Sequence, residues 1–548
     1  MVLYRIKYKV VGPFFVFIFS FLAVNRFWKP FSNNFSPSLD AIWNIPTAAL
    51  AFGDNRFGVS PGWTIDIAGY HLPLVAGPYL GAFKSYLLSA FFLIEPNYVE
   101  SSQLFNQIIF GILVAVFYLL TSKFFSWIVA LTITGILFLC RGFIYSASLD
   151  YGPYLVGTLF ILISSILIFG AKSKENKTKF YLGLFCLGIA IADKLTILPI
   201  ALPLLLYVLF RATKLLKHLT EYLKALTIFL IPFIPMFLYF MRNGFAELLQ
   251  MTGIGSNPLP NFLSLQIYLN SLSSFITSTI GPKSPYLYNA FYGVTGENFE
   301  QYVLISIFLI LAFTFIYGLV LTRHNADYFF LISWAPISLI LLIPMNARPW
   351  HYQPLLPLFI LSICLALKAI FIDLQNKIRI DLSKLGISRN KKALYLSSLI
   401  TVLSLGALNL TSLDSSVLGS GIASPSHSAA ANYIDKREKI RSLICLDYSV
   451  CVPILAMMSR HDITIKADYS FDSTFPEEPQ NLLLQSATCE DALVVRKKLG
   501  ELTNSYEELL YNHSRNFLAS NSKADSIFIL IYESFSAGTS VGIWQKKC

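Results

Sequence analysis

Long apolar runs recur along most of the 548-residue chain and constrain its fold more than any other feature. A helix that crosses a bilayer needs roughly 17–25 mostly apolar residues. Only 13% of the residues are charged, against about a quarter in soluble domains. The sequence therefore predicts an α-helical polytopic membrane protein. About eleven runs, some of them short by this criterion, are candidate spans: 11–25, 104–121, 125–141, 152–171, 179–192, 195–210, 224–241, 302–322, 328–345, 351–372 and 393–411.

Lys and Arg gather in the loops between the apolar runs. The net charge of +11 therefore does not indicate a nucleic-acid partner. Basic loops remain on the cytoplasmic side of a membrane, and with the N-terminus inside, the basic stretches at 172–179, 211–224 and 376–392 are all cytoplasmic. The opposite side then receives a long first outer loop (26–103) and a third outer loop (242–301).

The chain after residue 411 is polar and is predicted to be a separate domain. Residues 1–411 form the membrane domain, and 412–548 form a small C-terminal extracytoplasmic α/β domain. The runs at 441–449 and 525–534 resemble short apolar strands, whereas 494–513 has helical spacing.

Cysteines divide between the two predicted domains. Three lie in or beside apolar runs, and four lie in the polar tail at Cys445, Cys451, Cys489 and Cys548. These four can form two disulfides in an oxidising compartment, with three pairings possible, or remain as free thiols.

Ionisable residues at the outer ends of spans are functional candidates, because a charge beside hydrocarbon is costly unless it is paired or hydrated. In the first outer loop, Asp40 and Asp54 flank an Ala-rich stretch that is predicted to be helical. The following stretch, 63–74, alternates like a hairpin strand and carries Asp66 and His71. Lys84 then lies in an amphipathic segment that we expect to lie against the membrane surface.

These features together resemble the GT-C class of polytopic glycosyltransferases. The resemblance rests on the first-loop acid, the Lys at the end of that loop, the Asp-x-Gly-Pro turn at 150–153 and the HYQPLLPLF run at 351–359. It is to the protein mannosyltransferase and aminoarabinose transferase type, and it covers roughly residues 1–411. It implies a GT-C-like fold and an inverting enzyme. The donor would be a polyprenyl-phosphate-linked sugar, and the acceptor a lipid, a glycan or a protein.

The resemblance also implies roles for particular residues. A first-loop acid would activate the acceptor, and basic residues would bind the donor's lipid phosphate, which gains charge as it leaves. The catalytic candidates are Asp40, Asp54 and Asp150, the phosphate-binding candidates are Lys84, Arg141, Lys194 and Arg348, and the substrate-binding candidates are Tyr151, His351 and Tyr352.

Two aspartates compete for the role of the first-loop acid. Asp40 fits the pattern best, because a surface helix and a Gly-Asp turn follow it. Asp54 is the rival, since its distance along the chain to Lys84 also suits the class. The usual Asp-Glu pair is absent from both places, with Ala41 after Asp40 and Asn55 after Asp54.

Each candidate also has a structural interpretation. The aspartates can cap helices or turns, Lys84 and Lys194 can extend to the membrane interface, and Arg348 can anchor a helix end beside Trp350.

No cofactor is expected. His71 and His351, two of the seven histidines, lack the spaced partners of a metal site, and there is no nucleotide-binding fingerprint. A divalent ion between Asp150 and a first-loop aspartate stays as an alternative.

A secondary transporter or lipid flippase is the alternative function. That class predicts charges near the middle of spans, whereas the candidates here lie at outer ends. A receptor or scaffold would leave the first-loop charges unexplained. The predicted location is a bacterial inner membrane, with the active site and the C-terminal domain on the periplasmic side.

Overall fold

The structure is a computed structural model of the chain. It describes residues 2–28, 41–54, 56–57, 63–67, 70–77, 80–95, 97–140, 143–144, 154–171, 176–244, 269, 275, 297–342, 349–378, 425–445, 448–458, 460, 462–467, 487–498, 528–536 and 539–546. The chain forms two compact units, and each is described by itself. The first comprises residues 1–25, 107–148 and 153–413, and the second comprises 26–106, 149–152 and 414–548.

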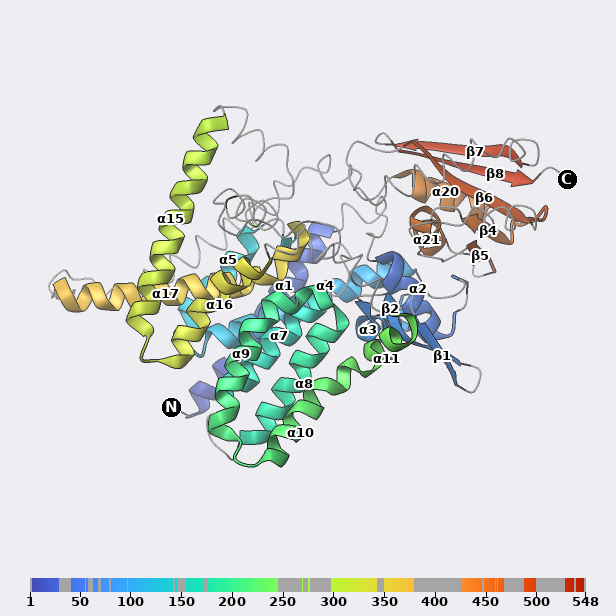
Figure 1. Ribbon diagram of the computed structural model, residues 1–548. Coiled ribbons are helices and arrows are strands. Elements are labelled where there is room, and N and C mark those ends of the chain that lie inside the picture. The colour runs from blue at the N-terminus through green and yellow to red at the C-terminus, as the bar shows by residue number, and fades with distance from the viewer. Residues whose placement is uncertain are drawn as a thin grey trace. The chain divides into compact units, whose positions relative to one another are not determined.

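The described elements of the first unit are helices (Figure 1). Helix α1 (Val2–Trp28) begins in it, and α4 (Tyr98–Thr121) enters it from the second unit. The others are α5 (Trp127–Ile136), η3 (Leu137–Leu139), α7 (Tyr154–Gly170), α8 (Lys177–Asp193), η5 (Leu195–Ile197), α9 (Leu198–Leu215), α10 (Leu219–Leu230), η6 (Ile231–Phe233), α11 (Ile234–Asn243), α15 (Glu297–Thr322), α16 (Ala326–Leu342), η8 (Pro349–Leu355) and α17 (Leu356–Ile378).

Four described helical segments are long and apolar enough to cross a membrane by length and composition: Tyr98–Thr121, Leu195–Leu215, Leu219–Arg242 and Tyr352–Leu374. Shorter apolar helices lie at Val11–Asn25, Phe83–Leu93, Trp127–Leu139, Tyr154–Gly170, Phe308–Thr322 and Ala326–Leu342. The predicted spans up to 372 thus each coincide with a described helix, and the predicted span at 393–411 lies outside the described residues.

Small residues allow the helices of the first unit to approach closely. Helices α7 and α8 pack against each other, and Figure 1 shows them side by side with α9 and α10. Ser164 on α7 donates a hydrogen bond to the carbonyl of Gly183 on α8 at 2.7 Å. A Cβ on Gly183 would lie 2.8 Å from Ile168 Cγ1. A larger residue there would therefore push α7 and α8 apart.

Polar contacts join helix ends that the sequence places on the same side of the membrane. Arg211 Nη2 on α9 pairs with Asp327 Oδ1 on α16 at 2.8 Å. Lys368 on α17 donates to the carbonyl of Phe124, which follows α4, at 2.7 Å. Lys177 on α8 pairs with Glu221 on α10. All three contacts join helix ends that the predicted order of spans puts on the cytoplasmic side, and the number of spans and their orientation stay predictions.

The first-loop part of the second unit contains both helices and strands. It contains α2 (Ala41–Phe52), β1 (Trp63–Ile67), β2 (Tyr70–Gly77), β3 (Leu80–Gly81), α3 (Phe83–Ser89) and η2 (Ala90–Leu93). The predicted helix after Asp40 is confirmed as α2. The predicted hairpin is confirmed as antiparallel β1 and β2, in which Asp66 and His71 are register partners.

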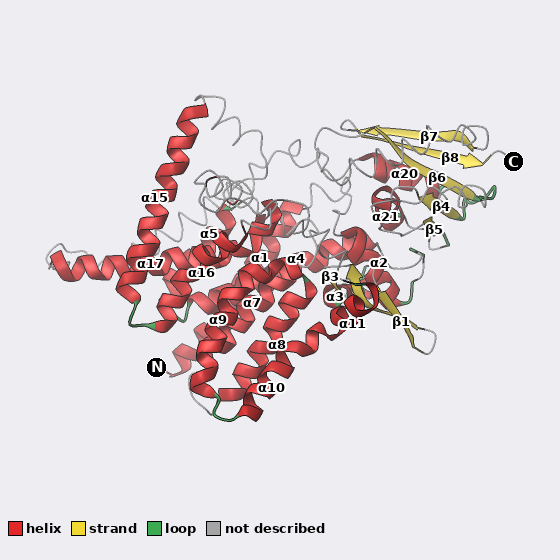
Figure 2. Cartoon of the chain, viewed as in Figure 1, coloured by secondary structure: helices red, strands yellow, loops and turns green. Residues whose placement is uncertain are grey.

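The C-terminal part of the second unit is a five-stranded sheet in the order β5-β4-β6-β8-β7, drawn in yellow in Figure 2. Its strands are β4 (Ser442–Cys445), β5 (Thr464–Ala467), β6 (Asp491–Lys498), β7 (Phe528–Ser536) and β8 (Thr539–Lys546), and its helices are α20 (Pro425–Asp435) and α21 (Tyr448–Met457). β4 is parallel to β5 and β6, whereas β8 is antiparallel to β6 and β7.

The helix predicted to begin at residue 494 is wrong over its first turn. Residues 494–498 belong to strand β6, which pairs with β4 on one side and with β8 on the other. Pairing on both edges and burial of Leu493 and Val494 outweigh the local helical preference, because neighbouring strands decide strand stability. Residues 499–513 lie outside the described part.

Disulfide bonding distinguishes the two groups of cysteines. Cys451 and Cys489, both in the C-terminal part of the second unit, are disulfide-bonded. Cys140, Cys186 and Cys364 in the helical unit are free thiols. Disulfide bonding is thus confirmed for two of the four tail cysteines, and the pairing among the four stays as the sequence left it.

Candidate functional site

Asp54 is placed by the way helix α2 ends. Gly53 adopts a φ of +95°, a left-handed conformation that glycine adopts without the steric cost of a Cβ. Its N–H donates to the carbonyl of Leu50 at 3.0 Å, and the N–H of Asp54 donates to the carbonyl of Ala49 at 2.8 Å. This pair of bonds is the Schellman motif that ends many helices. The Gly-Asp sequence therefore ends helix α2, and it fixes the main chain of Asp54 at the C-terminal end of that helix.

The Asp54 carboxylate is held by an arginine and a tyrosine. Oδ1 accepts the main-chain N–H of Arg56 at 2.9 Å, and Oδ2 accepts Arg56 Nε at 2.8 Å. The hydroxyl of Tyr98 also donates to Oδ2. The Asp54 and Arg56 side chains are only 15% and 7% exposed, so water screens this pair weakly. These contacts fix the direction of the carboxylate.

Tyr98 reaches Asp54 from the start of α4. Asn97 caps that helix, because its Oδ1 accepts the N–H of Val99 at 3.0 Å and that of Glu100 at 3.2 Å. The Tyr98 ring lies 4.2 Å from the Phe92 ring, centroid to centroid, and 5.1 Å from the Arg56 guanidinium carbon. Packing on these sides holds the ring so that its hydroxyl meets the carboxylate.

Lys84 is fully buried on α3 in the same unit. Its neighbour Ser85 donates to Asn44 Oδ1 on α2 at 3.4 Å, and α3 packs against α2. The Lys84 side chain is enclosed by protein, whereas Tyr86, Leu93 and Ile94 of the same segment are exposed; the placement of this segment against the membrane surface stays a prediction. A buried ammonium group requires compensating polar or charged partners, so its position is specific rather than incidental.

Lys194 is a second buried lysine, and it lies in the helical unit. It follows α8 in an extended conformation (φ −150°, ψ 103°), and its Nζ lies 3.9 Å from the centroid of the Tyr154 ring. The Tyr154 hydroxyl is 3.2 Å from Thr196 Oγ1 on η5. Tyr352 is buried in η8, which packs against α7 and η5. Lys194 and Tyr352 therefore belong to the same end of the helical unit.

The remaining predicted residues have less structural description. His351 lies in η8, where only its backbone is described. Asp40, Arg141, Asp150, Tyr151 and Arg348 lie outside the described residues. In the part of the chain that is described, no group of three or more His, Cys, Asp and Glu residues could hold a metal ion.

Sequence reasoning missed the partners of Asp54. Arg56 lies two residues beyond it and could have been found from its place beside the Gly-Asp turn. Tyr98 is 44 residues from Asp54, and no spacing in the sequence connects the two.

Comparisons with known proteins agree with this architecture. Residues 81–239 match the family model of dolichyl-phosphate-mannose-protein mannosyltransferase. The fold is similar to that of ArnT from Cupriavidus metallidurans. The crystal structure of ArnT bound to undecaprenyl phosphate has a TM-score of 0.53 and 13% identity, covering 97% of this chain and 98% of that one. Its apo crystal structure has a TM-score of 0.54 and 12% identity over the same shares. A search of curated protein sequences gives no match.

The family match and the whole-chain fold together confirm the resemblance predicted from the sequence, which is to the GT-C class of polytopic membrane glycosyltransferases. Residues 81–239 are similar to the protein mannosyltransferase family, and the fold is similar to that of ArnT. The apolar helices agree with an integral membrane protein.

Proposed function

We propose that this protein is an inverting glycosyltransferase that moves a sugar from a polyprenyl-phosphate-linked donor to a lipid, glycan or protein acceptor. The family match and the ArnT-like fold support the reaction class. ArnT binds undecaprenyl phosphate in one of its crystal structures, which supports a donor of this chemical type. One observation carries the proposal. The Asp54 carboxylate is oriented by Arg56 and Tyr98, and it lies in the same compact unit as the buried Lys84.

Asp54 is the acid that the geometry favours. Its Oδ1 accepts one hydrogen bond among the described contacts, from the main-chain N–H of Arg56, and a carboxylate oxygen has two acceptor sites. In the proposed step, Asp54 accepts the proton of the acceptor hydroxyl or amine as that group attacks the anomeric carbon. The bond from that carbon to the phosphate oxygen breaks, and its electron pair leaves with the polyprenyl phosphate. Attack opposite the leaving group inverts the anomeric centre.

The leaving phosphate needs positive charge nearby as it departs. Lys84 is the leading candidate, because a lysine ammonium is a compact point charge suited to phosphate oxygens. Lys194 is the candidate in the helical unit, and Arg141 and Arg348 remain predictions from the sequence. Asp40 and Asp150 also stay predictions as catalytic groups, and Tyr151, His351 and Tyr352 as substrate-binding groups. No metal enters the proposed step.

We place the reaction on the extracytoplasmic face, in a bacterial inner membrane. The disulfide-bonded Cys451 and Cys489 support an oxidising compartment for the second unit. The basic loops predicted as cytoplasmic lie in the helical unit.

The direct test uses the purified full-length protein and radiolabelled polyprenyl-phosphate sugars. Each donor is incubated with the protein and with separate lipid, glycan and protein fractions of a bacterial envelope. We expect label to move from one donor into one fraction, with release of polyprenyl phosphate. If no donor in the panel loses its sugar while the protein is folded and membrane-inserted, the proposed function is wrong.

A further inference from the structure

Arg56 contacts the C-terminal sheet as well as Asp54. Its Nη1 donates to the carbonyl of Arg460 at 2.7 Å, and its own carbonyl accepts the N–H of Ile465 at 2.8 Å. Ile465 is in β5, which is the end strand of the described sheet. An end strand leaves main-chain groups without a strand partner, and here Arg56 satisfies one of them. All of these residues belong to the second compact unit, although 404 residues separate Arg56 from Arg460.

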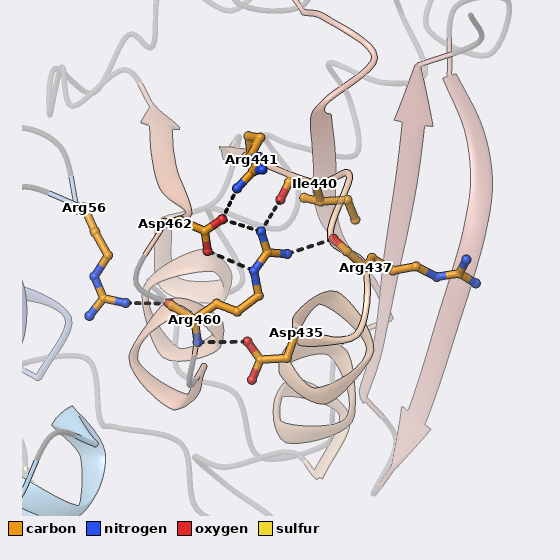
Figure 3. A network of polar contacts seen from close by, with 7 residues as sticks. All are labelled: Arg56, Asp435, Arg437, Ile440, Arg441, Arg460 and Asp462. Atoms are coloured by element: carbon orange, nitrogen blue, oxygen red, sulfur yellow. Dashed lines mark hydrogen bonds and ion pairs between the residues drawn. The ribbon is translucent and has the colours of Figure 1, made fainter.

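Arg460 is itself held in place by a network of polar contacts (Figure 3), and this fixes its carbonyl. Its main-chain N–H donates to Asp435 Oδ1 at 3.2 Å. Its guanidinium donates to both carboxylate oxygens of Asp462, at 2.9 and 2.7 Å, and to the carbonyls of Arg437 at 2.8 Å and Ile440 at 3.0 Å. The hydrogen bond to Asp462 raises the pKa of Arg460, and the same bond lowers the pKa of Asp462 to about 2. Both groups are therefore charged at neutral pH.

Two sets of contacts thus meet at Arg56. The sheet fixes the Arg56 main-chain carbonyl and Nη1, whereas Asp54 accepts from the Arg56 main-chain N–H and Nε. A side chain bonded at Nη1 and Nε together has little freedom to rotate, because the guanidinium is planar and its donors have a fixed geometry. A shift of the Arg460 loop would therefore move the Asp54 carboxylate.

We propose that Arg56 is a positioning residue that couples the Asp54 carboxylate to the edge of the C-terminal sheet, so that this sheet is part of the scaffold of the active site. The coupling rests on the proposed function only for its effect on catalysis. Its structural part is that a displacement of Arg460 is passed through Arg56 to Asp54. This part holds whether or not the donor is correctly identified. The two parts are tested separately.

Hydrogen exchange of the full-length protein tests the structural part. The reporters are the amides of Arg56 and Ile465, each of which donates a bond described above. Arg460→Lys removes the two-nitrogen contact with Asp462, and we expect exchange at both amides to rise about fivefold, as for the loss of a hydrogen bond. Asp462→Asn is the second variant, which weakens the same contact while leaving Arg460 intact.

Arg437→Lys is the matched control. The Arg437 carbonyl accepts a hydrogen bond from Arg460, and the substitution keeps this carbonyl. The Arg437 guanidinium lies 5.0 Å from the centroid of the Tyr433 ring and points away from Arg460 in Figure 3. This control should leave exchange at both amides unchanged. Exchange in Arg460→Lys and Asp462→Asn equal to that of the wild type would overturn the coupling.

Kinetics test the catalytic part, with the donor that the wild-type protein uses in the panel. Arg56→Lys keeps the positive charge but cannot bond through two nitrogens. We expect kcat to fall about 10- to 100-fold, because a small displacement of a catalytic group has a large effect on rate, with KM for the donor within about twofold of the wild-type value. Arg460→Lys should lower kcat in the same direction by less. A raised KM with unchanged kcat would overturn the positioning role, whereas a wild-type protein that uses no donor would refute the proposed function and leave the exchange result standing.

Discussion

Arg56 donates two hydrogen bonds to Asp54, one from its main-chain N–H to Oδ1 at 2.9 Å and one from Nε to Oδ2 at 2.8 Å. Both oxygens of the carboxylate are thereby oriented by one residue two positions along the chain. Charge-assisted bonds of this kind are stronger than neutral ones, and this pair is mostly buried. Asp54 is therefore a fixed carboxylate rather than a surface acid, which is what a catalytic role requires.

Replacing Asp54 by Asn should abolish most transfer. We expect a fall of about 10²- to 10⁴-fold in kcat, the usual contribution of a placed general base, while binding of undecaprenyl phosphate stays unchanged. The measurement is label transfer from the donor, together with a binding assay for undecaprenyl phosphate.

The chain offers a matched control for this substitution. Asp327 is likewise paired with an arginine and a tyrosine, Arg211 and Tyr207, in the helical unit. Asp327→Asn should lower stability without changing kcat. Unchanged turnover in Asp54→Asn would remove Asp54 from the mechanism, and a loss in Asp40→Asn alone would transfer the role to Asp40.

Lys84→Met should weaken the use of the lipid donor. Methionine keeps the length of the buried side chain and removes the charge, so we expect KM for the donor to rise at least tenfold, the loss of a charged hydrogen bond. Kinetics at several donor concentrations measure this. Lys214→Met, which changes an exposed lysine, is the control. Equal KM values for the two variants would contradict a phosphate contact by Lys84.

Tyr98→Phe removes a single hydroxyl beside Asp54. One hydrogen bond contributes about 1 kcal/mol, so stability should fall by roughly that amount and kcat by about fivefold. Tyr207→Phe makes the same change beside Asp327 and should lower stability alone. If both variants lose stability and neither loses turnover, the Tyr98 hydroxyl has only a structural role.

The C-terminal sheet should lose stability in acid through Asp491. Burial raises the pKa of its carboxyl, but hydrogen bonds from Lys466, Ser442 and Thr488 outweigh burial, and the pKa lies below its ordinary value. A carboxyl whose pKa is lower in the folded state stabilises the fold above its unfolded pKa, about 3.9, and loses that contribution as pH falls through the folded value. The stability of the sheet is measured by urea unfolding of the full chain, with hydrogen exchange at the β6 amides as the readout. We expect this stability to fall below pH ~4.

Asp491→Asn should flatten this dependence, and Glu490→Gln, at an exposed neighbour, should not. An identical slope in Asp491→Asn and the wild type would exclude Asp491 as its source.

Reduction should destabilise the second unit. Cys451 and Cys489 are disulfide-bonded, and removing a native disulfide from a small domain typically costs about 2–5 kcal/mol. Alkylation of the denatured, unreduced chain should label Cys140, Cys186 and Cys364 but spare Cys451 and Cys489. If all five of these cysteines are labelled in protein isolated from the bacterial inner membrane, the result contradicts both the disulfide bonding and the proposed compartment.

Local sequence pattern was sufficient for elements that have their causes nearby. The Ala-rich stretch before Gly53 predicts α2, and alternation at 63–74 predicts the hairpin of β1 and β2. Apolar runs predict the helices of the first unit, because each helix satisfies its own main-chain hydrogen bonds within the run. The helix predicted from residue 494 failed where the cause is distant: β4 and β8 decide that strand.

The sequence by itself determined that the chain is a helical membrane protein with acidic and basic residues in a long first loop, because hydrophobic length and charge placement are local properties. Only the tertiary structure decided that the first loop belongs to the same compact unit as the C-terminal sheet. It also brought Tyr98 to Asp54 and Arg460 to Arg56, and it enclosed Lys84 in protein. The first two contacts join residues 44 and 404 positions apart, and their energies depend on burial and geometry that no local pattern encodes.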